Sequence, residues 1–263
     1  MKQLLKKMGT VILLVSIGSL GVLQAAASDL NTLKLLKTAM SSRVMIQIVA
    51  KDYLYIGNEV AVTKAKKEMA AALKAFDAKQ KKLADSINDP KIKNLMAFID
   101  MNVDEIKNTV KQPYSLDNAA VVVDLAEAIS EGELKVADQI RKRAKYKGAA
   151  FKGQRYDIEQ IAKYYMAYQA GLKDDVTVRQ MKKTVEHFQG LLQGMKSYKG
   201  NNAKMNQIMN RVDKLWKIVH QFYLDIEEGG LPLIVYQTSR KLDDEQIKYA
   251  KEVIKVKSAR KGK

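Results

Sequence analysis

Two stretches of the chain share a pattern that decides the fold. Residues 43–54 read RVMIQIVAKDYL and residues 155–166 read RYDIEQIAKYYM. In both, an arginine, an isoleucine, an Ala-Lys pair and a tyrosine recur at the same spacing. Apolar residues recur every three or four positions here and along most of the chain, which is typical of helices that bury one face.

The match between the two stretches extends beyond them. At a shift of 112 positions, seven residues between 43 and 76 are identical, where average composition gives roughly two by chance. After one inserted residue, at a shift of 113, Met96 meets Met209 and Lys135 meets Lys248. We infer a tandem duplication of a four-helix unit.

Turn signals divide each copy into helices. Gly57-Asn58 ends a first helix, and Asp89 before Pro90 is typical of an N-cap followed by a first-turn proline. The sequence predicts an all-α fold of two tandem antiparallel four-helix bundles, residues 28–146 and residues 147–263. Because the junction lacks a strong breaker, an alternative joins the fourth and fifth helices in one long continuous helix.

Composition excludes several functional classes. The chain of 263 residues contains no cysteine and two histidines, which leaves no thiolate zinc site, disulfide framework or cysteine nucleophile. His187 and His220 lie far apart in sequence without suitably spaced carboxylates, so we expect no metal site. No nucleophile–base pattern or cofactor-binding loop is present, so we expect neither an enzyme nor a bound cofactor.

The N-terminus predicts export. Lys2, Lys6 and Lys7 precede an uncharged apolar run, and Ala25-Ala26-Ala27 supplies small residues for a signal peptidase. We expect a signal peptide over residues 1–27, cleaved near Ala27, and a periplasmic protein. An uncleaved N-terminal helix that anchors the protein in the inner membrane is the alternative, because the apolar run is just short of a comfortable span.

The quoted stretches resemble a known signature. Residues 43–54 are similar to the Arg-Met-Leu-Ser-Gln-Arg-Ile-Ala-Lys-x-Tyr-Leu motif of the PilJ/NarX-like sensor domain. This domain is the N-terminal module of type IV pili methyl-accepting chemotaxis transducers and of nitrate/nitrite sensor kinases. The second copy matches the motif in Gln154-Arg155 and in residues 161–165, and together the two units cover nearly all of the chain after the predicted signal peptide.

The resemblance implies a periplasmic four-helix bundle that pairs with a second bundle, within one chain or in a homodimer. It places Arg43 and Arg155 where the family's motif arginine binds nitrate or nitrite. In a tandem protein the two arginines would face each other across one anion site. A guanidinium presents a fork of donors that suits an oxyanion. Gln47, Lys51 and Lys163 lie near the same helical faces and complete the predicted anion site.

Other interpretations of these residues stay open. The family's glycine before the arginine is Met40 in the first copy and Lys152 in the second. Glu159, four residues after Arg155, is placed to neutralise that arginine within its own helix. Lys51 and Lys163 are more often lysines that extend past core residues toward water than ligands of an anion.

The net positive charge indicates an anionic ligand or binding partner. The chain carries 46 basic and 29 acidic side chains, a formal charge of +17, and removal of the signal peptide lowers it to +14. Because the charges are spread out and not interleaved with aromatics, we do not expect nucleic acid. The leading hypothesis is a periplasmic sensor that binds a small anion and acts through a membrane receptor or envelope protein. The alternative is a ligand-free helical scaffold of the cell envelope.

Overall fold

Helices make up nearly all of the part of the chain that the structure describes. The structure is a computed structural model that describes residues 31–145 and 153–261, with side chains as far as Val256. No strand occurs in these residues, so the all-α prediction is confirmed. The predicted signal peptide lies outside the described residues. Within those residues, no helix has the length and apolar character needed to span a membrane.

The helices follow one another in two similar series. The first series contains a helix over residues 31–57, here called the first helix, followed by α2 (Val62–Ser86), α3 (Pro90–Thr109) and α4 (Leu116–Arg143). The second contains α5 (Gln154–Gln169), α6 (Asp175–Lys196), α7 (Ala203–Leu224), the short 3-10 helix η1 (Ile226–Glu228) and α8 (Pro232–Lys261).

The turn signals act as the sequence predicts. The carboxylate of Asp89 accepts a hydrogen bond from the amide of Ile92 at 3.0 Å, and Pro90 opens α3. The alternative of one continuous helix across the junction is wrong, because α4 ends at Arg143 and α5 begins at Gln154. Lys145, just after α4, has a φ of 50°, a left-handed conformation in which an α-helix does not continue.

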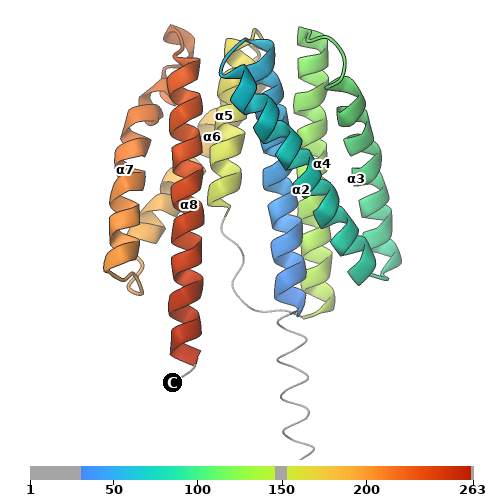
Figure 1. Cartoon of the computed structure of the whole chain (residues 1–263), viewed down its shortest axis with the longest axis vertical. Helices are drawn as coiled ribbons and strands as arrows, with labels where there is room; N and C mark the ends of the chain where they lie inside the picture. The colour runs from blue at the N-terminus through green and yellow to red at the C-terminus, as the bar shows by residue number, and fades with distance from the viewer. Residues whose placement is uncertain (1–30, 146–152, 262–263) are drawn as a thin grey trace, which may run out of the picture.

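The two motif-bearing helices lie at the centre of the molecule. In Figure 1 the first helix, in blue, and α5, in yellow, run in the same direction, with α4 and α8 antiparallel to them. α3 packs on α4 and α7 packs on α8, while α4 and α8 both contact α5. A single buried apolar cluster contains side chains from both halves, so the division into two separate bundles stays a prediction.

One helix crosses from the first half to the second. α2 runs obliquely across the front of the molecule in Figure 1, and its Glu68 reaches α8. There Tyr236 donates a hydrogen bond to Glu68 at 3.3 Å, and the Nε atom of Arg240 lies 3.2 Å from the same oxygen. α2 therefore contributes to the joint between the halves as well as to its own half.

The turn after the first helix yields a test of packing. A Cβ atom on Gly57 would overlap the ring of Tyr114, which packs at a tilt against Tyr53 and whose hydroxyl accepts a hydrogen bond from the Asn58 side chain. We expect Gly57→Ala to lower the free energy of unfolding by about 1–3 kcal/mol, because the ring has to move. Urea unfolding followed by circular dichroism measures the change.

Gly190 provides the matched control. It lies inside α6, and a Cβ atom there would have no neighbour within 4 Å. Gly190→Ala should therefore raise the free energy of unfolding by about 0.5–1 kcal/mol, since alanine loses less backbone entropy in a helix. Equal effects of the two substitutions would contradict the packing described at Gly57.

Candidate functional site

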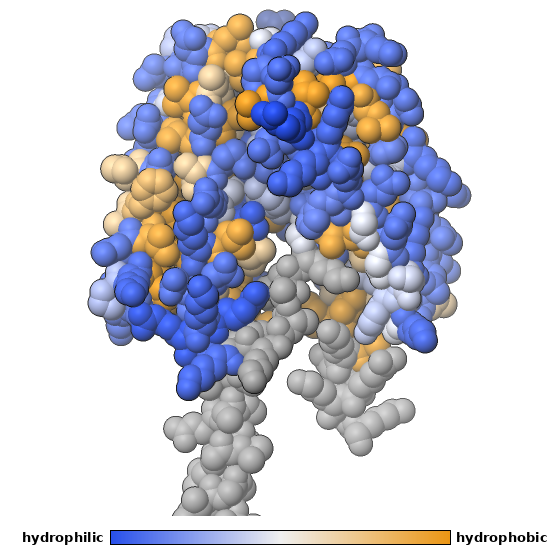
Figure 2. All heavy atoms as spheres, turned by 180° about the vertical axis from the view of Figure 1, so that it is seen from behind, coloured by the Kyte–Doolittle hydropathy of each residue, from blue (hydrophilic) through white to orange (hydrophobic). Residues whose placement is uncertain are grey.

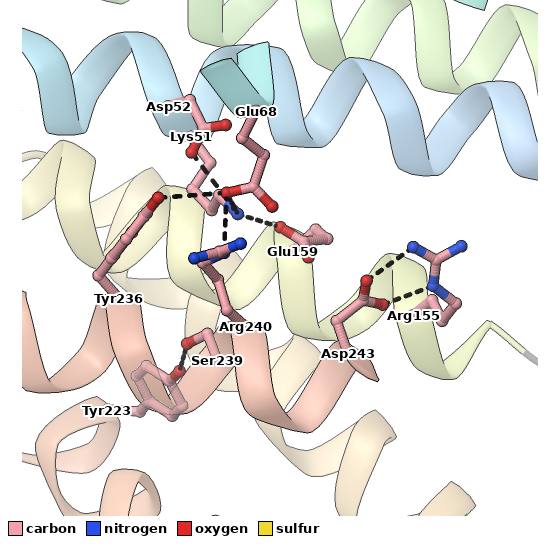
Figure 3. A network of polar contacts seen from close by, with 10 residues as sticks. All are labelled: Lys51, Asp52, Glu68, Arg155, Glu159, Tyr223, Tyr236, Ser239, Arg240 and Asp243. Carbon is pink, nitrogen blue, oxygen red and sulfur yellow. Dashed lines mark hydrogen bonds and ion pairs between the residues drawn. The ribbon is translucent and has the colours of Figure 1, made fainter. Parts of the chain in front are cut away.

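The residues predicted to bind an anion all lie on the two central helices. Arg43, Gln47 and Lys51 are on the first helix, and Arg155 and Lys163 are on α5. The structure brings these helices together, yet it gives each of the five side chains a partner within the protein. The network around Lys51 and Arg155 is shown in Figure 3.

Arg155 binds a carboxylate of its own half. Its Nη2 atom donates to Oδ2 of Asp243 on α8 at 2.7 Å, and its Nε atom donates to Oδ1 at 2.5 Å. Burial opposes the charge of Arg155, but the bonds to Asp243 hold its pKa above the usual value. The predicted ion pair with Glu159 in the same helix is not formed among the described residues, because Glu159 binds Lys51 instead.

Arg43 is held in an equivalent way. Its Nε atom donates to the carbonyl oxygen of Ser130 on α4 at 3.0 Å, and its guanidinium lies over the Tyr156 ring, 4.0 Å from the centroid. Ser130 and Asp243 are related by the shift of 113, as the two arginines are by 112. Each motif arginine therefore contacts the last helix of its own half.

Lys51 is buried and paired, so the prediction that it extends toward water is wrong. Its side chain is 1% exposed, and its Nζ atom lies 2.7 Å from Oε2 of Glu159. Asp52 and Glu68 lie 3.7 Å and 3.8 Å from the same nitrogen. This Lys51 cluster joins the first helix, α2 and α5, and through Arg240 and Tyr236 it continues into α8 (Figure 3).

Carboxylates outnumber the lysine in the Lys51 cluster. Burial opposes the charge of Lys51, but Asp52, Glu159 and Glu68 together hold its pKa well above the usual value. Burial raises the pKa of Asp52 strongly and that of Glu159 to about 7. The cluster therefore retains a proton on a carboxyl group near neutral pH, and it offers no free positive charge to an anion.

Lys163 is also completely buried, and its Nζ atom donates to Glu127 on α4. Gln160 donates to the same carboxylate at 3.0 Å, and Gln47 donates to it at 3.1 Å and to the Ser130 hydroxyl at 2.9 Å. Burial raises the pKa of Glu127, but the bonds from Lys163 and the amides lower it below the usual value. The Glu127 network thus ties α4 of the first half to α5.

A surface groove lies next to Arg43, one of the predicted site residues. A groove of about 510 Å³ is lined by Arg43 and Tyr156 together with Asp157, Gln160, Lys183 and His187. The Nδ1 atom of His187 lies 2.8 Å from the Asp157 carboxylate, whose pKa burial raises to about 6. Arg43 itself is bound by Ser130 and Tyr156, whereas Lys183 forms no ion pair among the described residues.

The repeat shows how the residues that line this groove differ from their counterparts in the first half. At the shift of 112, Gln180, Lys183 and His187 correspond to Glu68, Ala71 and Ala75 in the first half. Glu68 fills its side of the joint with ion pairs, whereas the α6 residues leave the other side open. The two copies have therefore diverged at the joint.

The partners of the basic residues were not identified from the sequence. In the sequence, each of their carboxylate partners has the pattern of a charged residue on the exposed face of a helix. These partners are Glu127, Asp243, Asp52 and Glu68. The repeat contained one indication of these partners. At the shift of 113, Ser130 in the fourth helix aligns with Asp243 in the last helix, and these two residues bind the two motif arginines. Within the described residues, no cluster of histidine and carboxylate side chains is suited to a metal ion.

Comparison of the chain with family models, curated proteins and solved structures finds no significant match. The resemblance to the PilJ/NarX-like domain therefore stays a prediction that rests on the quoted residues.

The Lys51 cluster predicts a strong response to loss of its cation. Lys51→Met should lower the free energy of unfolding by about 3–5 kcal/mol, because Glu159 is left buried without a counter-charge. Lys51→Met/Glu159→Leu should recover part of this loss, since Glu159 no longer lies buried without a counter-charge, while Asp52 still lacks its cation. Chemical denaturation of the three proteins measures both changes.

Lys107→Met is the matched control, because Lys107 pairs with Asp77 at 2.8 Å on the surface. Exposed pairs of this kind contribute about 0–1 kcal/mol. If Lys51→Met destabilised the protein no more than Lys107→Met, the buried pairing would be wrong.

A second buried carboxyl group predicts a dependence on pH. Glu133 on α4 is fully buried beside Gln80 of α2, and burial raises its pKa from 4.5 to about 8. Because the folded state prefers the protonated form, its contribution to stability is complete below about pH 4.5 and is lost as the pH rises toward 8. In that window the group changes the free energy of unfolding by about 1.4 kcal/mol per pH unit.

Glu133→Gln should therefore give a flatter dependence of unfolding free energy on pH between about 5 and 8. Glu131→Gln, on the exposed side of the same helix, should keep the wild-type slope. Denaturation at a series of pH values compares the three proteins. Identical slopes for all three would show that Glu133 titrates normally.

Proposed function

We propose that the protein is a helical interaction protein of the cell envelope, in which the predicted anion site has become the internal joint between two repeated halves. One observation carries this proposal: three of the four basic residues of the predicted site are bound by carboxylates of the protein. Arg155 binds Asp243, Lys51 binds Glu159, and Lys163 binds Glu127.

The electrostatics of the joint support this proposal. An incoming anion would have to displace carboxylates that already lie at bonding distance. It would also approach Asp52, Glu68 and Glu159, which surround Lys51 and leave it no unpaired positive charge. Buried ion pairs of this kind are strongly destabilised when one partner is removed, so the internal arrangement resists exchange for a weak external ligand.

The envelope location comes from the sequence. The N-terminal pattern predicts export to the periplasm, and the resemblance to the PilJ/NarX-like sensor domain agrees with that location. In this proposal the four-helix units no longer report a ligand, and they present helical surfaces to a membrane receptor or another envelope protein.

A second candidate is favoured by one specific observation. The groove beside Arg43 is lined by three basic residues, Arg43, Lys183 and His187, of which His187 already contacts the Asp157 carboxylate. A small anion bound there would make the protein a sensor with one site per chain, because the equivalent position beside Arg155 is closed by Asp243.

A thermal-shift series separates the two candidates. The protein is melted with nitrate, nitrite, sulfate, phosphate and small carboxylates at constant ionic strength. The interaction protein should show no selective rise in Tm, because stabilisation requires binding to the folded state.

The same series is run on two variants. A rise of several degrees for one anion, lost in Arg43→Ala and kept in Lys111→Ala, would overturn the leading proposal and establish the sensor. Lys111 is a suitable control because it is exposed and lies at the end of α3, away from the groove.

A further inference from the structure

Charged side chains are segregated between the two ends of the molecule. At one end of the molecule the first helix, α3 and α7 begin, and α2, α4, α6 and α8 end. We call this the basic end. It lies at the bottom of Figure 1. The opposite end contains the turns after the first helix, α3, α5 and α7.

The basic end carries exposed lysines from both halves that form no ion pair among the described residues. Examples are Lys82, Lys91, Lys93, Lys142, Lys199 and Lys251. Two of the carboxylates near this end are already paired, Asp89 with Arg143 and Glu252 with Lys204. In Figure 2, which shows the back of the molecule, hydrophilic side chains gather at the lower rim to the left of the grey atoms.

The opposite end has the reverse character. Acidic side chains predominate there, and most belong to the turns and first residues of the helices: Glu59, Asp117, Asp174, Asp175, Glu227 and Glu228. Lys64, Lys111 and Lys173 are exposed lysines of this end. The molecule is therefore electrically polar along the direction of its helices.

Helix dipoles do not account for the basic end. Cations suit the C-terminal turns of α4 and α6, which contain Arg141, Lys142, Arg143 and Lys196. However, Lys91 and Lys93 open α3 and Lys204 opens α7, where the positive end of the dipole disfavours cations. Neither of these first turns contains an acidic residue. Lys204 pairs with Glu252, but Lys91 and Lys93 form no ion pair among the described residues and gain nothing from the dipole of α3, which points to a role outside the fold.

We propose that the basic end binds the surface of an anionic phospholipid membrane, with the helices standing on that surface. Unpaired lysines spread over a broad end suit a flat anionic surface, to which each contributes additively. A nucleic acid strand would favour a basic stripe with aromatic residues along it, and the basic end has no such stripe among the described residues. The inference rests on the proposed envelope location and does not depend on the groove beside Arg43.

The test is a vesicle-binding measurement on the chain from Ser28 onward. This chain contains every described helix and lacks the apolar N-terminal run, which would enter lipid by itself. Vesicles of phosphatidylcholine with one quarter phosphatidylglycerol are compared with vesicles of phosphatidylcholine alone. We expect binding to the anionic vesicles only, with a partition coefficient that falls as salt rises.

Two charge-reversal variants locate the binding face. Lys91→Glu/Lys142→Glu/Lys199→Glu changes the basic end, and Lys64→Glu/Lys111→Glu/Lys173→Glu makes the same change in charge at the opposite end. The first should lower the partition coefficient by about 100-fold or more, whereas the second should change it by only a few-fold. Circular dichroism verifies that both variants are folded.

Three outcomes would overturn the proposal. The first is absence of binding to the anionic vesicles at low salt. The second is an equal fall in the partition coefficient of the two variants, which would indicate a general electrostatic attraction without a defined binding face. The third is tighter binding to inorganic polyphosphate or to a short RNA duplex than to the vesicles at the same ionic strength. An anion-induced Tm shift tests the groove separately, so the two proposals fail independently.

Discussion

The arrangement of the halves depends on neutralising charges that have been removed from water. Lys51 and Lys163 lie completely inside the protein, and Arg155 is largely covered. An isolated buried cation is very unfavourable, so each requires a carboxylate at bonding distance. Glu159, Glu127 and Asp243 meet this requirement from three different helices, which fixes how the first helix, α4, α5 and α8 pack.

The same constraint explains how two similar copies came to differ. Both copies keep the arginine and lysine of the repeated motif, and both arginines contact the last helix of their own half. In the first half Glu68 on α2 turns toward the joint and pairs with Lys51 and Arg240. In the second half its counterpart Gln180 has no charge to offer, and the groove beside Arg43 stays open.

The sequence predicted local features far better than these pairings. Helical periodicity, the cap at Asp89 and the end of the first helix at Gly57 are encoded by neighbouring residues, and the structure confirms them. The partner of Lys51 is 108 positions away and that of Arg155 is 88 positions away. A single sequence does not reveal such contacts, because a buried carboxylate and a solvated one have the same local pattern. The repeat predicted that Arg43 and Arg155 occupy equivalent positions, but it did not predict the direction in which each side chain points.

The two buried lysines of the repeated motif are the residues whose ion pairs hold the halves together. A double-mutant cycle across Lys163 and Glu127 tests this role most directly, because this pair joins α5 to α4 of the other half. The free energy of unfolding is measured for Lys163→Met, Glu127→Gln and the double variant. We expect a coupling energy of about 2–3 kcal/mol, because the two charges meet inside the protein. A coupling below about 0.5 kcal/mol, the range of independent sites, would contradict it.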